Sequence, residues 1–191
     1  MEKVLYIIAG CNGAGKTTAA TTILPEILKC REFVNADEIA RGLSPFNPES
    51  VAFEAGRYML LRIKSLLESG QSFSIETTLS TRAYRQLVID AHNRGYRVEL
   101  LFFWLRTPEL AIRRVAQRVR EGGHHVPDDV VRRRYSRGIA NLFNLFMGIV
   151  DFWALYDNSE TPRRRIAYGG CGSTTVEVAP ITFNQIKTYV G

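Results

Sequence analysis

Gly10-Cys11-Asn12-Gly13-Ala14-Gly15-Lys16-Thr17 is the stretch that decides the fold, because it fits the phosphate-binding pattern G-x-x-x-x-G-K-[ST]. The apolar run at residues 4–8 predicts a buried strand before it, and residues 17–28 predict a helix after it. Glycines let backbone N–H groups curl around a phosphate, and the N-terminus of a helix adds a partial positive charge. A loop in this strand-to-helix context predicts nucleotide binding.

The residue types of this loop suit ATP and Mg²⁺. We expect Lys16 to reach the β- and γ-phosphates, the Thr17 hydroxyl to hold Mg²⁺, and Thr18 to reach the α-phosphate. Cys11 is expected to be a passive thiol in preference to an oxidation switch. The predicted nucleotide-binding residues are Gly10, Asn12, Gly13, Ala14, Gly15, Lys16, Thr17 and Thr18.

Length and composition limit the class of protein. A chain of 191 residues suits one domain, residues 1–191, and its three widely spaced cysteines favour neither a disulfide framework nor a zinc site. No stretch has the apolar length of a membrane span, and the chain enters its first predicted strand almost at once, which leaves no room for a signal peptide. These features predict a cytoplasmic protein without a membrane partner.

The net charge of +6 is concentrated in one segment. Residues 106–137 hold nine arginines and four acids, which gives +5 of that total. Arg114 and Arg118 share one face of a predicted helix, and Gly122-Gly123-His124-His125 breaks the chain before a second helix. We expect a mobile, phosphate-sensing lid over about residues 106–137, with a solvated basic face as the alternative. A hinge explains the two histidines more simply than a metal site.

Acidic side chains follow two further predicted strands. A strand at residues 32–35 leads to Asp37, and a strand at residues 71–75 leads to Glu76 and Thr77. The carboxyl ends of parallel strands are where open α/β sheets bind ligands, so these residues are expected near Lys16. Asp37 also fits the first turn of a helix capped by Asn35, and both interpretations can hold together.

The strands complete a prediction of the fold. Residues 98–105 and 165–168 add two strands to the three predicted above, which makes five, and residues 176–178 are a further candidate. The chain beyond Trp153 is expected to form a loop before residue 165. The expected architecture is an α/β, three-layer P-loop NTPase of the nucleotide-kinase type, with a mainly parallel five-stranded central sheet and a helical lid.

Missing motifs narrow the chemistry. The sequence has no Asn-Lys-x-Asp guanine-reading motif, and no convincing strand ends in a magnesium-binding Asp-Glu pair, so a GTPase switch and a mechanical ATPase are disfavoured. A short domain with an arginine lid and acids at neighbouring strand ends is typical of a small-molecule kinase.

Several motifs together resemble the zeta-toxin family of P-loop kinases. They are residues 10–18, 33–37 (Phe-Val-Asn-Ala-Asp), 43–49 (Leu-Ser-Pro-Phe-Asn-Pro-Glu), 76–80 (Glu-Thr-Thr-Leu-Ser), 114–124 and 133–135, within a match over roughly residues 4–150. The resemblance implies ATP and Mg²⁺ as cofactors, phosphorylation of a UDP-N-acetyl sugar such as UDP-N-acetylglucosamine, and a possible antitoxin partner.

The same resemblance implies roles for individual residues. Asp37 matches the general base, Glu76 a second acid near the substrate with Thr77 beside it, and Lys16 the nucleotide site; Arg118 and Arg134 are the lid arginines expected to neutralise the transferring phosphoryl group. The alternatives are a P-loop kinase of another hydroxyl metabolite or nucleoside and, third, a nucleic-acid-associated ATPase. Nucleic acid ranks low as a partner because no stacking aromatics interleave with the arginines.

Overall fold

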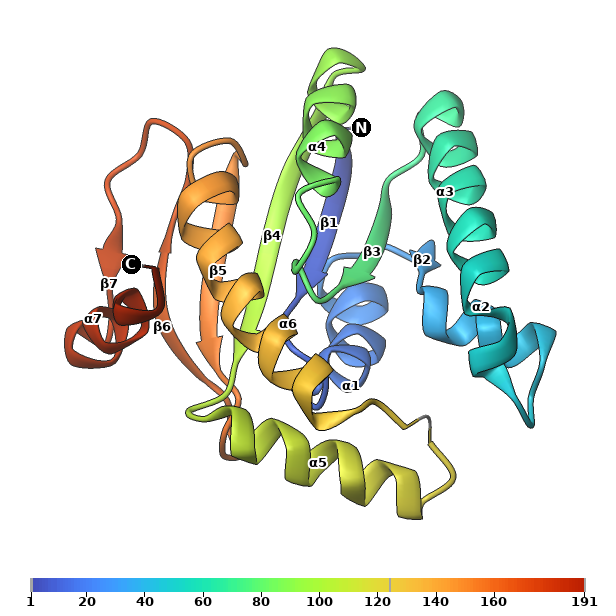
Figure 1. Ribbon diagram of the computed structural model, residues 1–191. Helices are drawn as coiled ribbons and strands as arrows, with labels where there is room; N and C mark the ends of the chain where they lie inside the picture. Colours follow the sequence, from blue (N-terminus) through green and yellow to red (C-terminus); the bar gives the residue numbers. More distant parts are fainter. Residues whose placement is uncertain (1, 124, 191) are drawn as a thin grey trace.

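The computed structural model describes residues 2–123 and 125–190, and its centre is a seven-stranded sheet in the order β2-β3-β1-β4-β5-β6-β7 (Figure 1). Five strands pair in parallel, and β6 and β7 are added antiparallel at one edge. The strands are β1 (Lys3–Ala9), β2 (Phe33–Val34), β3 (Phe73–Thr77), β4 (Tyr96–Trp104), β5 (Phe152–Asp157), β6 (Arg164–Gly169) and β7 (Val176–Glu177).

Helices cover the sheet. They are α1 (Lys16–Thr22), α2 (Ala36–Leu43), α3 (Ala52–Ser69), α4 (Tyr84–Asn93), α5 (Pro108–Arg120), α6 (Asp128–Asn141) and α7 (Pro180–Lys187), with short 3₁₀ or π turns η1 (Ile23–Ile27), η2 (Pro48–Val51), η3 (Leu142–Phe146) and η4 (Thr188–Val190). In Figure 1, α5 lies along the edge at which the parallel strands end. None of the helices in the described residues combines the length and apolarity needed to cross a membrane.

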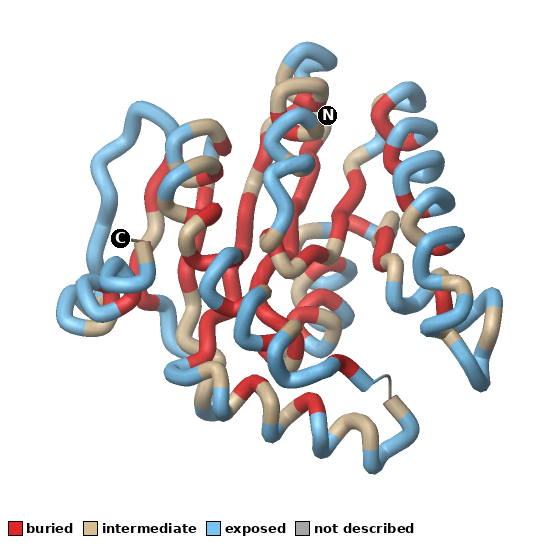
Figure 2. The backbone as a smooth tube through the Cα atoms, in the orientation of Figure 1, coloured by how far each residue is buried: buried red, intermediate tan, exposed pale blue. Residues whose placement is uncertain are grey.

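The core lies along the central strands. From Val4 to Ala9, β1 is buried at successive residues, and β4 is buried from Leu100 to Trp104 (Figure 2). Successive side chains of a strand point to opposite faces, so an unbroken buried run means that both faces of the sheet are covered. β1 and β4 are therefore central strands of the sheet, and the candidate site is built at the edge where these strands end.

The α/β P-loop prediction with a mainly parallel sheet is confirmed, with one difference in the strand count. The sheet has seven strands where five were predicted, because residues 152–157 form β5 and residues 176–177 form β7. The segment after Trp153 was expected to be a loop, and that was wrong: β5 pairs in parallel with β4 from Glu99 to Trp104. His124, half of the predicted histidine hinge, lies outside the described residues.

Candidate active site

The phosphate-binding loop joins β1 to α1 and depends on three glycines. Gly10, Gly13 and Gly15 have φ angles of 143°, 77° and 77°, which L side chains rarely adopt. A Cβ at Gly10 would lie 2.3 Å from the Phe103 carbonyl oxygen, and one at Gly15 would lie 2.7 Å from Nδ2 of Asn158. The loop can therefore keep its curvature only with glycine at these positions.

Sheet register brings the other polar residues to this loop. Ile8 of β1 lies opposite Glu76 of β3, and Val34 of β2 lies opposite Ile75 of the same strand. Asn35 follows Val34 directly, so it lies beside Glu76 although 41 residues separate the two in the chain. Three parallel strands thus deliver the loop, an acid and an amide to one edge of the sheet.

Glu76 is the centre of the resulting network. Its Oε2 accepts hydrogen bonds from the Thr17 hydroxyl at 2.7 Å and from Nδ2 of Asn35 at 2.9 Å. Its Oε1 lies 3.5 Å from Nζ of Lys16, which also donates to the Cys11 carbonyl oxygen at 3.0 Å. Since Lys16 is 7% and Glu76 10% exposed, each charge depends on the other and on these hydrogen bonds for compensation.

Two of these groups fit a magnesium ion. Mg²⁺ prefers oxygen ligands and usually takes one or two from the protein, with phosphates and water completing its shell. The Thr17 hydroxyl and the adjacent Glu76 carboxylate supply that kind of ligand. Within residues 2–123 and 125–190, no group of three or more His, Cys, Asp or Glu side chains could hold a metal by itself, so bound phosphates would have to take part.

Asp37 lies in the first turn of α2, where Asn35 caps the helix. The Asn35 Oδ1 accepts hydrogen bonds from the backbone N–H of Asp37 at 2.8 Å and of Glu38 at 3.4 Å. The cap predicted from the sequence is therefore present, and it leaves the Asp37 side chain exposed. An exposed carboxylate held on a capped helix can meet a ligand without rearrangement of the backbone.

A cavity of about 270 Å³ brings six of the predicted site residues together. Asp37 lines it from α2, Lys16 from the start of α1, and Glu76 and Thr77 from the end of β3; Asn12 and Arg134 close it from the phosphate loop and α6. Thr77 is buried, and its hydroxyl accepts a hydrogen bond from the Leu79 N–H at 3.0 Å. The predicted substrate-binding residue Glu76 thus faces this cavity and also touches Thr17.

The two arginines that were predicted to belong to a lid, Arg118 and Arg134, approach the site from different sides. Nη1 of Arg134 donates a hydrogen bond to Oδ1 of Asn12 at 3.1 Å, which ties α6 to the phosphate loop. Arg118 lines a second cavity, of about 350 Å³, together with Thr17 and Asp37. Both arginines therefore lie next to the loop.

The Gly122-Gly123 pair has a structural role at the end of α5. Gly122 has φ +84° and donates from its N–H to the Val119 carbonyl at 3.0 Å, while the Gly123 N–H donates to the Arg118 carbonyl at 2.8 Å. These two bonds make a Schellman motif, which ends a helix with a left-handed glycine. A Cβ at Gly123 would lie 2.5 Å from Cγ of Arg118. The predicted hinge is thus also a tight helix stop, and lid motion stays a prediction.

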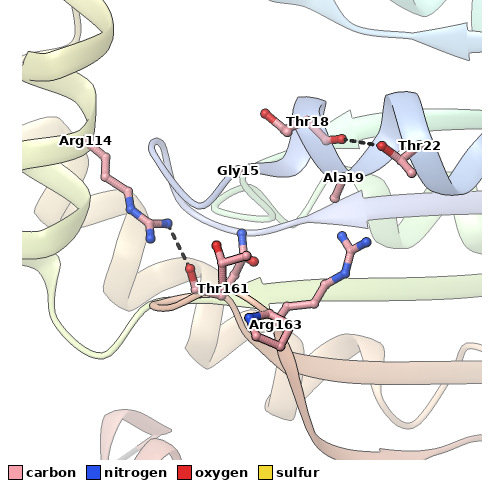
Figure 3. Close-up of a pocket in the computed structure, with 9 residues that line it drawn as sticks. Gly15, Thr18, Ala19, Thr22, Arg114, Thr161 and Arg163 are labelled. Carbon is pink, nitrogen blue, oxygen red and sulfur yellow. Dashed lines mark hydrogen bonds between the residues drawn. The ribbon is translucent and has the colours of Figure 1, made fainter.

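A third cavity, of about 450 Å³, contains residues that the sequence did not single out (Figure 3). Nδ2 of Asn158 donates to the Ala14 carbonyl at 2.7 Å, and Arg114 donates to the carbonyls of Asn158 and Ser159, both at 2.9 Å. Predicted loop residues Gly15 and Thr18 line this cavity with Arg114 and Asn158. The four-residue spacing of Arg114 and Arg118 could have indicated that Arg114 also lies near the phosphate loop. No such signal existed for Asn158, because it follows strand β5, which was not predicted.

Cys11 is poorly suited to be a redox switch. Its side chain is 4% exposed, and burial raises the pKa of the thiol to about 11, although Lys16 acts in the opposite direction. The thiolate is the reactive form of cysteine, so a raised pKa and burial both suppress its chemistry. These facts favour the passive thiol that was expected at this position.

Comparisons with known proteins agree with this fold. An uncharacterised protein of Haemophilus influenzae is 27% identical over 135 residues, covering 71% of this chain and 94% of that protein. Crystal structures of the AvrRxo1-ORF1:AvrRxo1-ORF2 complex match at 20% identity, with a TM-score of 0.78 for the form with sulphate ions and 0.76 for the form with ATP. That match covers 97% of this chain, which spans only 63% of the matched chain.

A further similar structure comes from the PezAT chromosomal toxin-antitoxin system of Streptococcus pneumoniae, with a TM-score of 0.65 at 19% identity over 95% of this chain and 76% of that one. At these identities the structures show a shared fold alone. The model of the family described as AAA domain (AAA_33) matches residues 5–138, which is well over half of the chain. The loop, the sheet order and this match lead to one conclusion: the chain belongs to the AAA_33 family of AAA domains.

Proposed function

We propose that this protein is an ATP-dependent kinase that transfers the γ-phosphate to a hydroxyl group of a small molecule. The observation that carries the proposal is the 270 Å³ cavity, in which the exposed Asp37 carboxylate and the buried Lys16 ammonium face the same space. Phosphoryl transfer depends on positioning and charge neutralisation, and a carboxylate is needed mainly to orient a hydroxyl and accept its proton. This cavity supplies both kinds of group.

The proposed roles follow from position. Asp37 takes the proton of the acceptor hydroxyl, and Lys16 binds the β- and γ-phosphates. Arg118 and Arg134 neutralise charge on the transferring group from the two sides on which they line the loop. Thr17 and Glu76 would hold Mg²⁺, which neutralises phosphate charge when bound. Residues 106–137 would close over the nucleotide as a lid.

We propose a zeta-toxin-like acceptor, a UDP-N-acetyl sugar such as UDP-N-acetylglucosamine, as the first compound to test. The motifs from residue 10 to residue 135 support it, and so does the fold shared with a structure from a toxin-antitoxin system. A partner antitoxin is proposed on the same grounds. The alternative acceptor is another hydroxyl metabolite or a nucleoside, which an apolar groove beside Asp37 favours.

The test is incubation with Mg-ATP and UDP-N-acetylglucosamine, followed by mass spectrometry of the products. We expect a phosphorylated sugar nucleotide from the wild type. Asp37→Asn should lower the rate by about 10²- to 10⁴-fold, the range for loss of a general base, while ATP still binds. Asp90→Asn is a matched change on α4, where the Asp90 carboxylate accepts a hydrogen bond from Nε2 of Gln86 at 2.9 Å, and it should leave the rate unchanged.

Other outcomes select among the alternatives. Wild-type turnover by Asp37→Asn would contradict the assignment of the base. A wild type that binds ATP and phosphorylates a different hydroxyl compound would replace the acceptor and keep the kinase. ATP hydrolysis stimulated by DNA or RNA, with an affinity that falls steeply as salt rises, would favour the nucleic-acid-associated ATPase instead.

A further inference from the structure

An apolar groove of about 430 Å³ lies between α3 and α4, beside the candidate active site. Phe53, Leu60 and Ile63 line it from α3, and Leu87 lines it from α4. Phe53 is 81% and Leu60 63% exposed, so large apolar side chains meet water there. Exposed apolar surface gathered into a concave site commonly marks a binding surface, and this volume is within the range of small-molecule pockets.

The groove is continuous with the 270 Å³ cavity that contains Asp37. Met59 and Tyr84 line both spaces, as do Ala36 and Thr81. Burial raises the pKa of the Tyr84 phenol, and the nearby Thr77 side chain, which lines the cavity, acts in the opposite direction. The polar end of Tyr84 therefore belongs to the cavity of the carboxylates, while its ring forms part of the apolar wall. One ligand could span the two spaces.

Gly56 keeps the groove open. It lies inside α3, where glycine costs roughly 1 kcal/mol relative to alanine, and a Cβ there would meet no atom within 4 Å. Neither a left-handed backbone nor a close neighbour explains the glycine, since it lies in the regular helix α3 and its Cβ position is open. Gly56 lines the groove, and a side chain at this position would occupy the space of the groove.

We propose that this groove binds the apolar part of the phosphate acceptor, which makes the acceptor the alternative one named above: a hydroxyl compound that carries an aryl or alkyl group. The inference rests on the proposed kinase function, because that function makes Asp37 the place of the hydroxyl. The apolar group lies against Phe53, Leu60 and Leu87, and the hydroxyl lies in the cavity of Asp37. Arg57, which also lines the groove, offers a cation to an anionic substituent.

The experiment measures binding to the groove directly. The probe is 8-anilinonaphthalene-1-sulfonate, whose fluorescence rises in apolar sites, and the competitors are phenyl β-D-glucoside and methyl β-D-glucoside, which share their hydroxyls and differ in the ring. The variants are Leu60→Ser, which removes part of the wall, and Gly56→Leu, which fills the space. Leu61→Ser is the matched control, because Leu61 is 62% exposed on the same helix and does not line the groove.

We expect the dissociation constant of the probe to rise about tenfold or more in Leu60→Ser and Gly56→Leu, the factor that the burial of one leucine side chain contributes. It should stay within about twofold in Leu61→Ser, on the scale of surface substitutions. Phenyl glucoside should displace the probe from the wild type, and methyl glucoside should not. Circular dichroism melting should show Gly56→Leu folded, since its new side chain meets open space.

Three results would overturn the inference: no probe binding, equal weakening by Leu60→Ser and Leu61→Ser, or binding that depends on Leu60 but resists both glucosides. The last result would show an apolar site that does not accept this class of hydroxyl compound. Binding of Mg-ATP is measured in the same samples. Its failure in the wild type would remove the kinase proposal and leave the probe result interpretable, so the two failures are distinguishable.

Discussion

Replacement of Asn35 is the sharpest test of how the site is assembled, because one side chain does two jobs. Its Oδ1 caps α2 through the N–H groups of Asp37 and Glu38, and its Nδ2 donates to Glu76 at 2.9 Å. Loss of an N-cap costs about 1 kcal/mol, and loss of a hydrogen bond to a charged group costs about 2 kcal/mol. We therefore expect Asn35→Ala to lower the free energy of unfolding by about 3 kcal/mol.

Asn35→Asp separates the two jobs. Aspartate is as good an N-cap as asparagine, but it cannot donate to Glu76 and brings a second carboxylate next to the first. This variant should keep the contribution of the cap and lose about 2 kcal/mol or more through the Glu76 contact. Urea unfolding at neutral pH measures both variants, with an unchanged dependence on urea concentration as the check that the denatured state is the same.

Asn47→Ala is the control, because Asn47 precedes η2 and makes no capping hydrogen bond through its side chain. The urea midpoint of Asn47→Ala should correspond to a free energy of unfolding within about 0.5 kcal/mol of the wild type. If Asn35→Ala unfolds at the same urea concentration as Asn47→Ala, Asn35 stabilises the fold neither by capping α2 nor by its hydrogen bond to Glu76, and the reasoning is refuted. If only Asn35→Asp matches the wild type, the Glu76 contact contributes nothing to stability and the cap alone remains.

Two more predictions concern titratable groups outside the transfer step. With a pKa of about 11, about one Cys11 thiol in a thousand is ionised at pH 8, so iodoacetamide should label exposed Cys171 first and Cys11 only in urea; equal labelling rates would contradict its burial. Partial burial acts to raise the pKa of Asp151, but hydrogen bonds from the Val98 N–H at 2.7 Å and from His92 at 2.9 Å prevail, and the folded-state pKa is lowered. This stabilisation is present above the unfolded pKa of about 4 and is lost as pH falls through the folded value, so the melting temperature of Asp151→Asn should vary less between pH 6 and pH 3 than that of the wild type.

Local patterns predicted the parts of the fold whose cause is local. The phosphate-loop glycines and the Asn35 cap of α2 follow from nearby residue types. Strand β5 was missed because its residues continue an apolar stretch that began as a helix. Residues 152–157 form a strand because they pair with β4, about fifty residues earlier in the chain. The local pattern of apolar residues does not indicate this pairing.

The candidate site shows the same division. The sequence placed Asp37 and Glu76 at strand ends near Lys16, and the structure brings all three to one cavity. It could not give the 2.7 Å contact between Glu76 and Thr17, since that distance depends on the register of β1 against β3. Asn158 was out of reach for the same reason, because its contact with Ala14 joins residues 144 positions apart.

The helix stop after α5 determines more than where that helix ends. Any Cβ at position 123 would clash with the aliphatic part of the Arg118 side chain. The Arg118 side chain can therefore lie where it does only because position 123 is glycine. Gly123 lines the same 350 Å³ cavity as Thr17, Asp37 and Arg118, and the lack of a side chain there leaves room for the stem of Arg118. An insertion or a larger residue at position 123 would move the Arg118 guanidinium relative to Thr17 and Asp37. The site would change although every proposed catalytic residue remained in the sequence.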